Sequence, residues 1–389
     1  MVAGRRRYSG SIYLFLWMAL ATLFSGAGFG AQSSPNFDQL AAQAASARAG
    51  GDLPRAADLY TRALQMNPAW PDGWWYLGQI DYSTNAYAQA TGAFTHYLAL
   101  VPNAAPATAL RGLCEFELGE YDASLADVQR ALSLGAADDS RNTQILRYHE
   151  ALLLTRLGRF EEALTAYAYF ARRHLSSDDV YVAIGLAAMR LPLMPKDANA
   201  EQSASAAMAG NAAFLLMLGD ASGAAQAFQQ FFARYPAAAN VHYTYGFLLY
   251  PTDQDAAITQ FQQEVTTHPD SSVSHTMLAW ALLMDNEPGK ALPEARKAAA
   301  AAPQLPLAQL SLGRALLETG DVKAAMPVLE SALALDPKNL EVHLALARAY
   351  SEAGREDDAR RERLTSLRLT EKSTKLAPAM GQQEEPPAK

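Results

Sequence analysis

Apolar residues recur at helical spacing along most of the chain, and residues 72–102 show this pattern most clearly. One stripe consists of Trp74, Leu77, Ile80 and Tyr82, and a second of Tyr87, Ala90, Phe94, Tyr97 and Leu98. Asn85 separates the stripes and Pro102 follows the second. Asn readily takes the left-handed conformation that ends a helix, and Pro cannot continue one. The segment therefore predicts two helices joined by a tight turn.

The same arrangement repeats at a nearly constant interval. Prolines recur at Pro68 and Pro102 and then at Pro236, Pro269, Pro303 and Pro337, at intervals of 34, then 33, 34 and 34 residues. An alanine lies twelve residues before each of them, at Ala56, Ala90, Ala224, Ala257, Ala291 and Ala325. Gly or Asn lies five residues before most of these alanines. Because one hairpin cannot bury its apolar face alone, the period predicts stacked hairpins sharing a continuous core.

These marks resemble the tetratricopeptide repeat family. Its W-x2-L-G, A-x3-F and P pattern is present as Trp74-x2-Leu77-Gly78, Ala90-x3-Phe94 and Pro102, although the next aromatic comes one residue late, at Tyr82. The resemblance covers residues 37–369. It implies an all-α, right-handed superhelical solenoid of antiparallel helix hairpins. In that family the first helices of the hairpins line a concave groove that receives peptides or partner helices.

One interruption of the period suggests how the chain is organised. The marker alanines Ala163 and Ala224 are 61 residues apart, and Pro192 and Pro195 lie between them. We expect four hairpins in 37–175, an irregular repeat with a Pro-rich insertion in 176–204, about five hairpins in 205–369 and a disordered tail in 370–389. The insertion is either neutral or a hinge or partner-specific loop.

The first thirty residues predict a secretory signal peptide. Arg5, Arg6 and Arg7 precede an apolar run over 12–24, and small residues follow before Ala31. A run of thirteen residues is short for a membrane span, which needs about 20. The chain is therefore expected to be an exported bacterial protein, periplasmic or secreted, after removal of residues 1–30. The alternative is that the segment is not cleaved and anchors the protein in the inner membrane.

Composition and motifs argue against catalysis and nucleic-acid binding. The 389 residues include one cysteine and carry a formal net charge of -8, which disfavours nucleic acid as a partner. None of the seven histidines forms a zinc-binding pattern, and no phosphate-binding loop or nucleophile elbow is present. Cys114 falls in a predicted packed helix, where an inert thiol is expected. The sequence therefore predicts no cofactor, no metal, no small-molecule substrate and no enzymatic activity.

Carrying the family's groove onto this chain gives candidate partner-binding residues on the first helices. They are Trp75, Gln79, Tyr82, Phe116, Tyr148, Arg156, Tyr243, Phe247, Tyr250, Trp280, Arg314 and Arg348. Tyr and Trp dominate interface energies, so this aromatic set fits a protein or peptide partner. The alternative is that these aromatics fill space between hairpins. The cations are too scattered for the family's clamp for a chain-terminal carboxylate.

The function predicted from the sequence is a non-catalytic protein–protein interaction scaffold that binds a partner segment in its groove. A first alternative is a membrane-tethered assembly factor for envelope complexes or exopolysaccharide export, which requires an uncleaved residue 12–24 segment. A second is an envelope polymer hydrolase. That alternative would need a non-repeat catalytic domain, and the repeats leave no stretch for one.

Overall fold

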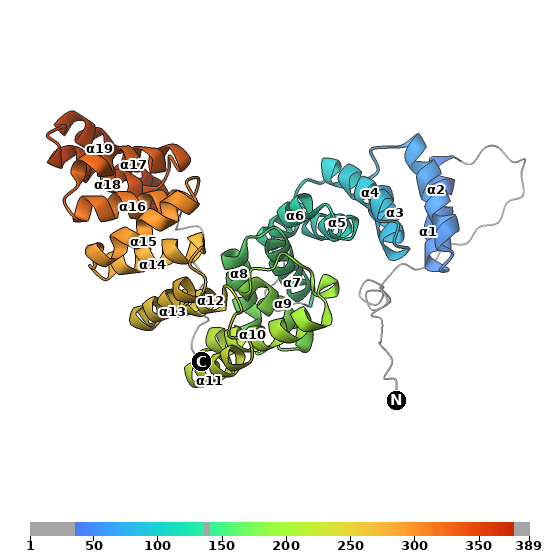
Figure 1. Ribbon diagram of the computed structural model, residues 1–389. Coiled ribbons are helices and arrows are strands. Elements are labelled where there is room, and N and C mark those ends of the chain that lie inside the picture. The colour runs from blue at the N-terminus through green and yellow to red at the C-terminus, as the bar shows by residue number, and fades with distance from the viewer. Residues whose placement is uncertain (1–35, 136–140, 377–389) are drawn as a thin grey trace, which may run out of the picture. The chain divides into compact units, whose positions relative to one another are not determined.

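The computed structural model describes residues 36–135 and 141–376, and within those ranges it contains α-helices, one short 3-10 helix and no strand (Figure 1). Consecutive helices pair across short turns, and most neighbouring hairpins pack against one another in chain order. The predicted all-α array of antiparallel helix hairpins is confirmed. The predicted signal peptide lies outside the described residues. None of the described helices has the length and apolar character to cross a membrane.

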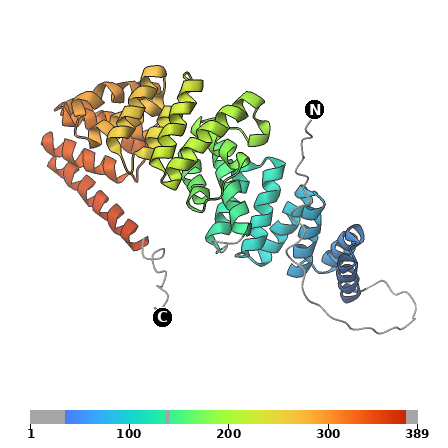
Figure 2. The same ribbon diagram turned by 90° about the horizontal axis from the view of Figure 1, so that it is seen from below.

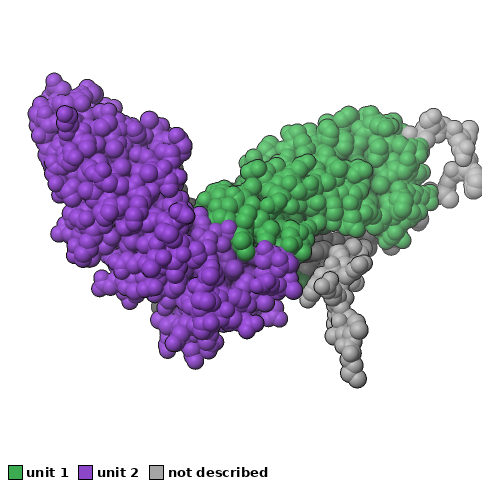
Figure 3. Space-filling model, in the orientation of Figure 1, with its two compact units in different colours: residues 1–173, 191–197 green, residues 174–190, 198–389 purple. Residues whose placement is uncertain are grey.

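The chain divides into two compact units, coloured separately in Figure 3. The first comprises residues 1–173 and 191–197. Its helices pair as α1 (Phe37–Ala49) with α2 (Leu53–Met66), α3 (Pro71–Ser83) with α4 (Tyr87–Leu100), α5 (Ala105–Leu118) with α6 (Tyr121–Ser133), and α7 (Arg141–Arg156) with α8 (Phe160–Arg172). The 3-10 helix η2 (Pro195–Asp197) also belongs to this unit.

The second unit comprises residues 174–190 and 198–389. It begins with α9 (Asp178–Ala188), α10 (Ala200–Leu218) and α11 (Ala221–Arg234), and α10 packs against both of the others. Hairpins follow as α12 (Val241–Leu249) with α13 (Gln254–Thr267), α14 (Ser272–Met284) with α15 (Pro288–Ala301), α16 (Pro306–Glu318) with α17 (Val322–Leu335), and α18 (Leu340–Glu352) with α19 (Glu356–Leu376). Figure 2 gives a second view of the same helices.

The repeated sequence markers have clear structural roles. Asn85 and Gly119 take left-handed backbone angles, with φ of +59° and +78°, and so end the first helix of their hairpins. The marker alanines are fully buried where the two helices of a hairpin meet. Ser124 takes the alanine position in the third hairpin, where its Oγ donates a 2.7 Å hydrogen bond to the carbonyl oxygen of Gly112. The buried hydroxyl is thereby satisfied.

The junction after α9 differs in detail from the sequence expectation. The irregular repeat with its Pro-rich insertion was expected to extend to residue 204, but α10 already begins at Ala200. Asn199 caps this helix, because its side chain accepts from the backbone N–H of Gln202 while the Gln202 side chain accepts from the backbone N–H of Asn199. The two prolines thus delay the second helix without abolishing it. The helix that follows is one of the longest in the described chain.

The C-terminal tail was predicted to start at residue 370. Helix α19 instead continues to Leu376, so residues 370–376 are helical. Residues 377–389, the rest of the predicted tail, lie outside the described residues.

Helices α5 and α6 enclose a cluster of charged groups. Asp127 accepts from Arg111 at 2.5 Å (Nε to Oδ2) and 2.9 Å (Nη2 to Oδ1). Glu115 lies 3.9 Å from the same guanidinium and is only 7% exposed. Its Oε2 has no hydrogen-bond partner among the described residues. Burial, with Asp127 nearby, raises the pKa of the Glu115 carboxyl from 4.5 to about 7.

This raised pKa predicts a pH-dependent gain of stability in Glu115→Gln. A carboxyl whose pKa is higher in the folded state contributes stability below pH 4.5 that is lost as the pH rises through 7. The neutral glutamine avoids this loss. We expect the free energy of unfolding of the variant to exceed that of the parent by about 2 kcal/mol at pH 8. Near pH 4.5 the two free energies are expected to be equal. Urea unfolding at both pH values measures this, and an equal difference at the two values would contradict it.

Candidate functional site

A surface hollow lies on the first helices α14, α16 and α18 of the second unit. It has a volume of about 430 Å³ and is lined by Leu283, Met284, Asn286, Pro288, Arg314, Glu318 and Arg348. Helix α16 contacts both α14 and α18, which brings side chains from successive repeats together. Trp280, Arg314 and Arg348 each lie eleven residues after an inter-repeat proline and so occupy one repeat position. The period therefore aligns them across three neighbouring helices.

Glutamates one helical turn away hold both arginines of the hollow. Arg314 Nη2 is 3.3 Å from Glu318 Oε1, and Arg348 Nε donates to Glu352 Oε1 at 2.8 Å. The Arg314 guanidinium also lies 5.2 Å from the centre of the Trp280 ring. Pairing and ring contact fix the guanidinium of Arg314, whereas the Arg348 side chain is still 54% exposed. Arg348 is therefore the more accessible hydrogen-bond donor for a partner.

Apolar side chains complete this surface. Met284 is 40% exposed, and Leu283 and Pro288 lie beside it in the hollow. Tyr250 shares a hydrogen bond with Trp280, and burial raises the pKa of the Tyr250 hydroxyl. A mainly polar hollow with two guanidinium groups and the exposed side chain of Met284 at hand suits a peptide segment that carries hydrogen-bond acceptors and an apolar side chain.

The prediction for Tyr243 is wrong as far as it requires an accessible side chain. Tyr243 is 4% exposed and belongs to the core between α12 and α13, near Phe261. The guanidinium of Arg190, just after α9, lies 5.2 Å from the Tyr243 ring. The segment just after α9 thus covers a position that the repeat pattern predicted to face the groove. Phe247 is half-buried and packs against the same core.

In the first unit the candidate aromatics are mainly packing residues. Trp75 lies 5.9 Å from Phe94 and 5.4 Å from Tyr97 between ring centres. The other three also contact rings in their own unit: Tyr82 contacts Tyr87, Phe116 contacts Tyr121 and His149, and Tyr148 contacts Phe170. All four are half-buried, as is Gln79. These contacts agree with the alternative that they fill space between helices.

Arg156 is exposed but already engaged within the first unit. Its Nη1 donates to the carbonyl oxygen of Pro192 at 2.9 Å, and its guanidinium lies 5.4 Å from the Tyr121 ring. The Pro-rich insertion therefore contacts one of the predicted groove positions.

Of the twelve candidates, the structure brings together Tyr250, Trp280, Arg314 and Arg348. The sequence pattern did not indicate that Asn286 and Pro288 line the hollow, because their positions in a turn and at a helix start already accounted for both residues.

Buried histidines serve the hairpin architecture. His275 Nδ1 lies 2.5 Å from Glu294 Oε2 and its Nε2 2.7 Å from the carbonyl oxygen of Pro269. His343 makes equivalent contacts with Glu362 and Pro337. These interactions tie each first helix to its second helix and to the preceding turn. Within the described ranges, no group of three or more His, Cys, Asp or Glu side chains is arranged to hold a metal ion.

Cys114 is fully buried in α5. Burial raises the pKa of its thiol to about 12, so the thiolate is scarce near neutral pH. This agrees with the prediction of an inert thiol.

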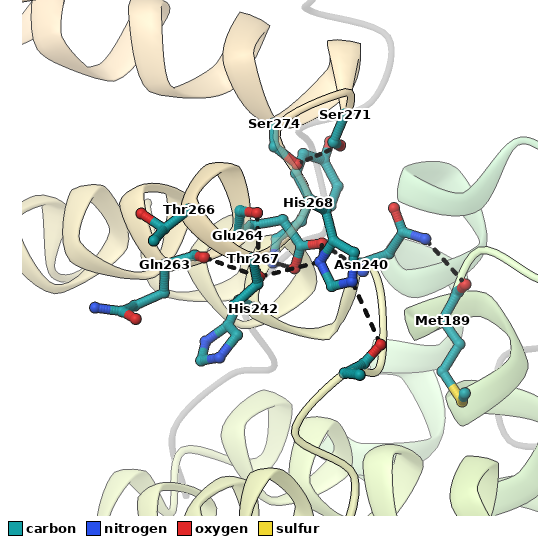
Figure 4. A network of polar contacts seen from close by, with 12 residues as sticks. Met189, Asn240, His242, Gln263, Glu264, Thr266, Thr267, His268, Ser271 and Ser274 are labelled. Atoms are coloured by element: carbon teal, nitrogen blue, oxygen red, sulfur yellow. Dashed lines mark hydrogen bonds and ion pairs between the residues drawn. The ribbon is translucent and has the colours of Figure 1, made fainter.

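A buried polar network fixes the start of α12 (Figure 4). The carboxylate of Glu264, on α13, is fully buried and accepts from the backbone N–H groups of Asn240 at 2.7 Å and Tyr243 at 3.2 Å. It also lies 2.9 Å from His268 Nδ1. Asn240 in turn donates from Nδ2 to the carbonyl oxygen of Met189 at 3.4 Å, just after α9. The network thus joins α9, α12 and α13 and has a structural role.

Comparison with known proteins places two segments of the chain in one family. Residues 41–105 and 316–362 match family models described as tetratricopeptide repeat. Similar solved structures include MamA 41-end from Desulfovibrio magneticus RS-1, which is 19% identical with a TM-score of 0.39 over 43% of this chain and 96% of that chain. YrrB, described as a TPR protein with an unusual peptide-binding site, is 16% identical with a TM-score of 0.38 over 42% of this chain and 84% of that chain. A search of curated proteins gave no match.

Proposed function

We propose that this tetratricopeptide repeat protein is an exported, non-catalytic scaffold that binds a segment of a partner protein across its C-terminal first helices. The hollow lined by Met284, Arg314 and Arg348 carries this proposal. There, apolar and cationic side chains from three consecutive repeats adjoin one another. A peptide that extends across α14, α16 and α18 would contact one repeat after another. Such repeated contacts give affinity without a deep pocket.

A displayed library of random peptides, selected on the full chain, tests the binding surface. We expect peptides enriched on the parent protein to lose about tenfold or more in affinity on Arg348→Ala, since arginine is a frequent hot-spot residue. Arg296→Ala is the matched control, because Arg296 is exposed on the second helix α15, outside the hollow. Enriched peptides that bind Arg348→Ala and the parent equally would place the binding surface elsewhere.

Export is the second part of the proposal and depends on the N-terminal segment. The basic residues Arg5–Arg7 and the apolar run over 12–24 support it. Mass spectrometry of the native N-terminus is expected to find a chain that begins near Ala31. A chain retaining residues 12–24 in the membrane fraction would instead favour the membrane-tethered assembly factor.

A further inference from the structure

Helix α19 carries an unusual exposed face. Leu364 and Leu367 are 47% and 59% exposed, among the highest values for large apolar side chains in the described chain. They lie three residues apart, close together on one side of the helix. Arg360, Arg363 and Arg368 are exposed around them. The face is thus a short apolar seam bordered by cations, which we call the α19 face.

The preceding repeat shows what this face does elsewhere in the array. Thirty-four residues earlier, Met326, Leu329 and Leu333 on α17 occupy the positions of Arg360, Arg363 and Leu367. All three pack into the core between α16, α17 and α18, and Leu329 is fully buried. Leu364 and Arg368 correspond to Glu330 and Ala334, which are exposed on α17, so only part of the α19 face matches the side by which a hairpin stacks on its successor. Arg360 and Arg363, which do match it, oppose another hairpin of the same kind, because a buried guanidinium without a carboxylate is strongly unfavourable.

The three arginines also differ from others nearby in lacking a counterion. Arg355 and Arg361 both pair with Asp358 in the first turn of α19. No acidic side chain in the described part of the chain lies within ion-pair distance of Arg360, Arg363 or Arg368. Over the whole of α19 the sequence has six Arg or Lys and five Asp or Glu, and three of the five acids lie in the first turn. The cations therefore lie along the helix after its acidic first turn.

We propose that the α19 face docks an acidic amphipathic helix of a partner protein. Leu364 and Leu367 would form the apolar seam, and carboxylates flanking the partner's own seam would pair with Arg360, Arg363 and Arg368. Interhelical pairs of this kind set partner choice when two helices pack side by side. A second α19 is a poor occupant, because it would place arginine against arginine. A membrane surface is disfavoured, because helices that lie in bilayers present a broader apolar face than two leucines.

Two synthetic peptides test the proposal with the full-length chain. Each has about 20 residues, long enough to be helical, and the same leucine seam, but one has Glu and the other Lys at the flanking positions. Fluorescence anisotropy at low salt is expected to show about tenfold tighter binding of the Glu peptide, falling as salt is added. In the triple variant Arg360→Glu, Arg363→Glu and Arg368→Glu, the preference is expected to reverse in favour of the Lys peptide.

Further variants separate docking from other effects. The double variant Leu364→Ser and Leu367→Ser changes only exposed side chains, so it is expected to keep the parent's thermal midpoint but to lose binding of the Glu peptide. Arg348→Ala is expected to bind the Glu peptide as tightly as the parent does. This result would separate the α19 face from the hollow on α14, α16 and α18. Failure to bind either peptide, equal binding of both, or an unchanged preference in the triple variant would overturn the proposal. So would arginine-dependent flotation with phosphatidylglycerol vesicles that exceeds binding of the Glu peptide, which would assign the face to a membrane.

Discussion

Gly210→Ala is expected to destabilise the second unit by about 3 kcal/mol or more, although alanine is normally the better helix former. Helices α9 and α10 cross with their backbones in contact at Gly185 and Gly210. A Cβ on Gly210 would collide with the carbonyl oxygen of Tyr181 and lie 2.7 Å from the backbone nitrogen of Gly185. Because these are backbone atoms, no side-chain rotation relieves the overlap. The two helices must move apart, and the core around them loses contacts.

Gly92→Ala provides the matched control for this prediction. Gly92 lies within α4, is exposed, and has no atom within 4 Å of the place where a Cβ would be. The same chemical change there is expected to stabilise the protein by about 1 kcal/mol. Urea unfolding measures both variants, and hydrogen exchange shows whether protection falls in α9 and α10. If Gly210→Ala is as stable as the parent, the close crossing is not required.

The second large effect is expected for Glu264→Ala, with a loss of about 3 to 5 kcal/mol. The variant leaves the backbone N–H groups of Asn240 and Tyr243 buried without their acceptor and removes the carboxylate beside His268 (Figure 4). Unsatisfied buried donors lose their full hydration energy, so this cost exceeds that of an exposed ion pair. The start of α12 is expected to lose hydrogen-exchange protection first.

Two variants on the same helix serve as comparisons for this loss of stability. Glu264→Gln retains one side-chain oxygen as acceptor and is expected to lose less stability than the alanine variant. Gln263→Ala changes the neighbouring exposed position and is expected to alter stability by about 0.5 kcal/mol or less. Urea unfolding measures the free energy of unfolding of all three variants. A Glu264→Ala protein as stable as Gln263→Ala would mean that water or a rearranged backbone replaces the carboxylate.

The sequence predicted the repeating features of the fold because they depend on local chemistry. Asn85 and Gly119 end helices through their backbone angles, and Ala90 is small where two helices meet, whatever the rest of the chain does. Local chemistry did not predict the close contact of Gly185 with Gly210, because α10 lies outside the regular period and its register against α9 is set by packing.

Candidate binding residues were less predictable, because exposure depends on neighbours. Tyr243 occupies a groove position in the repeat, yet Arg190 and the core around Phe261 enclose it. Arg156 occupies another, but it donates to Pro192 of the insertion. Trp280 and Arg348 remain partly accessible because the hairpins around them follow the period without interruption.

The sequence by itself determined that this chain forms helix hairpins, where most of them turn, and which small residues their helices share. Those properties follow from backbone conformation and side-chain size within one repeat. Only the tertiary structure decided that α10 serves both α9 and α11, that Glu264 caps α12, and that Arg360, Arg363 and Arg368 are exposed with no acidic side chain of the described residues within ion-pair distance. The physical reason is that burial and ion pairing are set by side chains from other helices, whose approach no single repeat encodes.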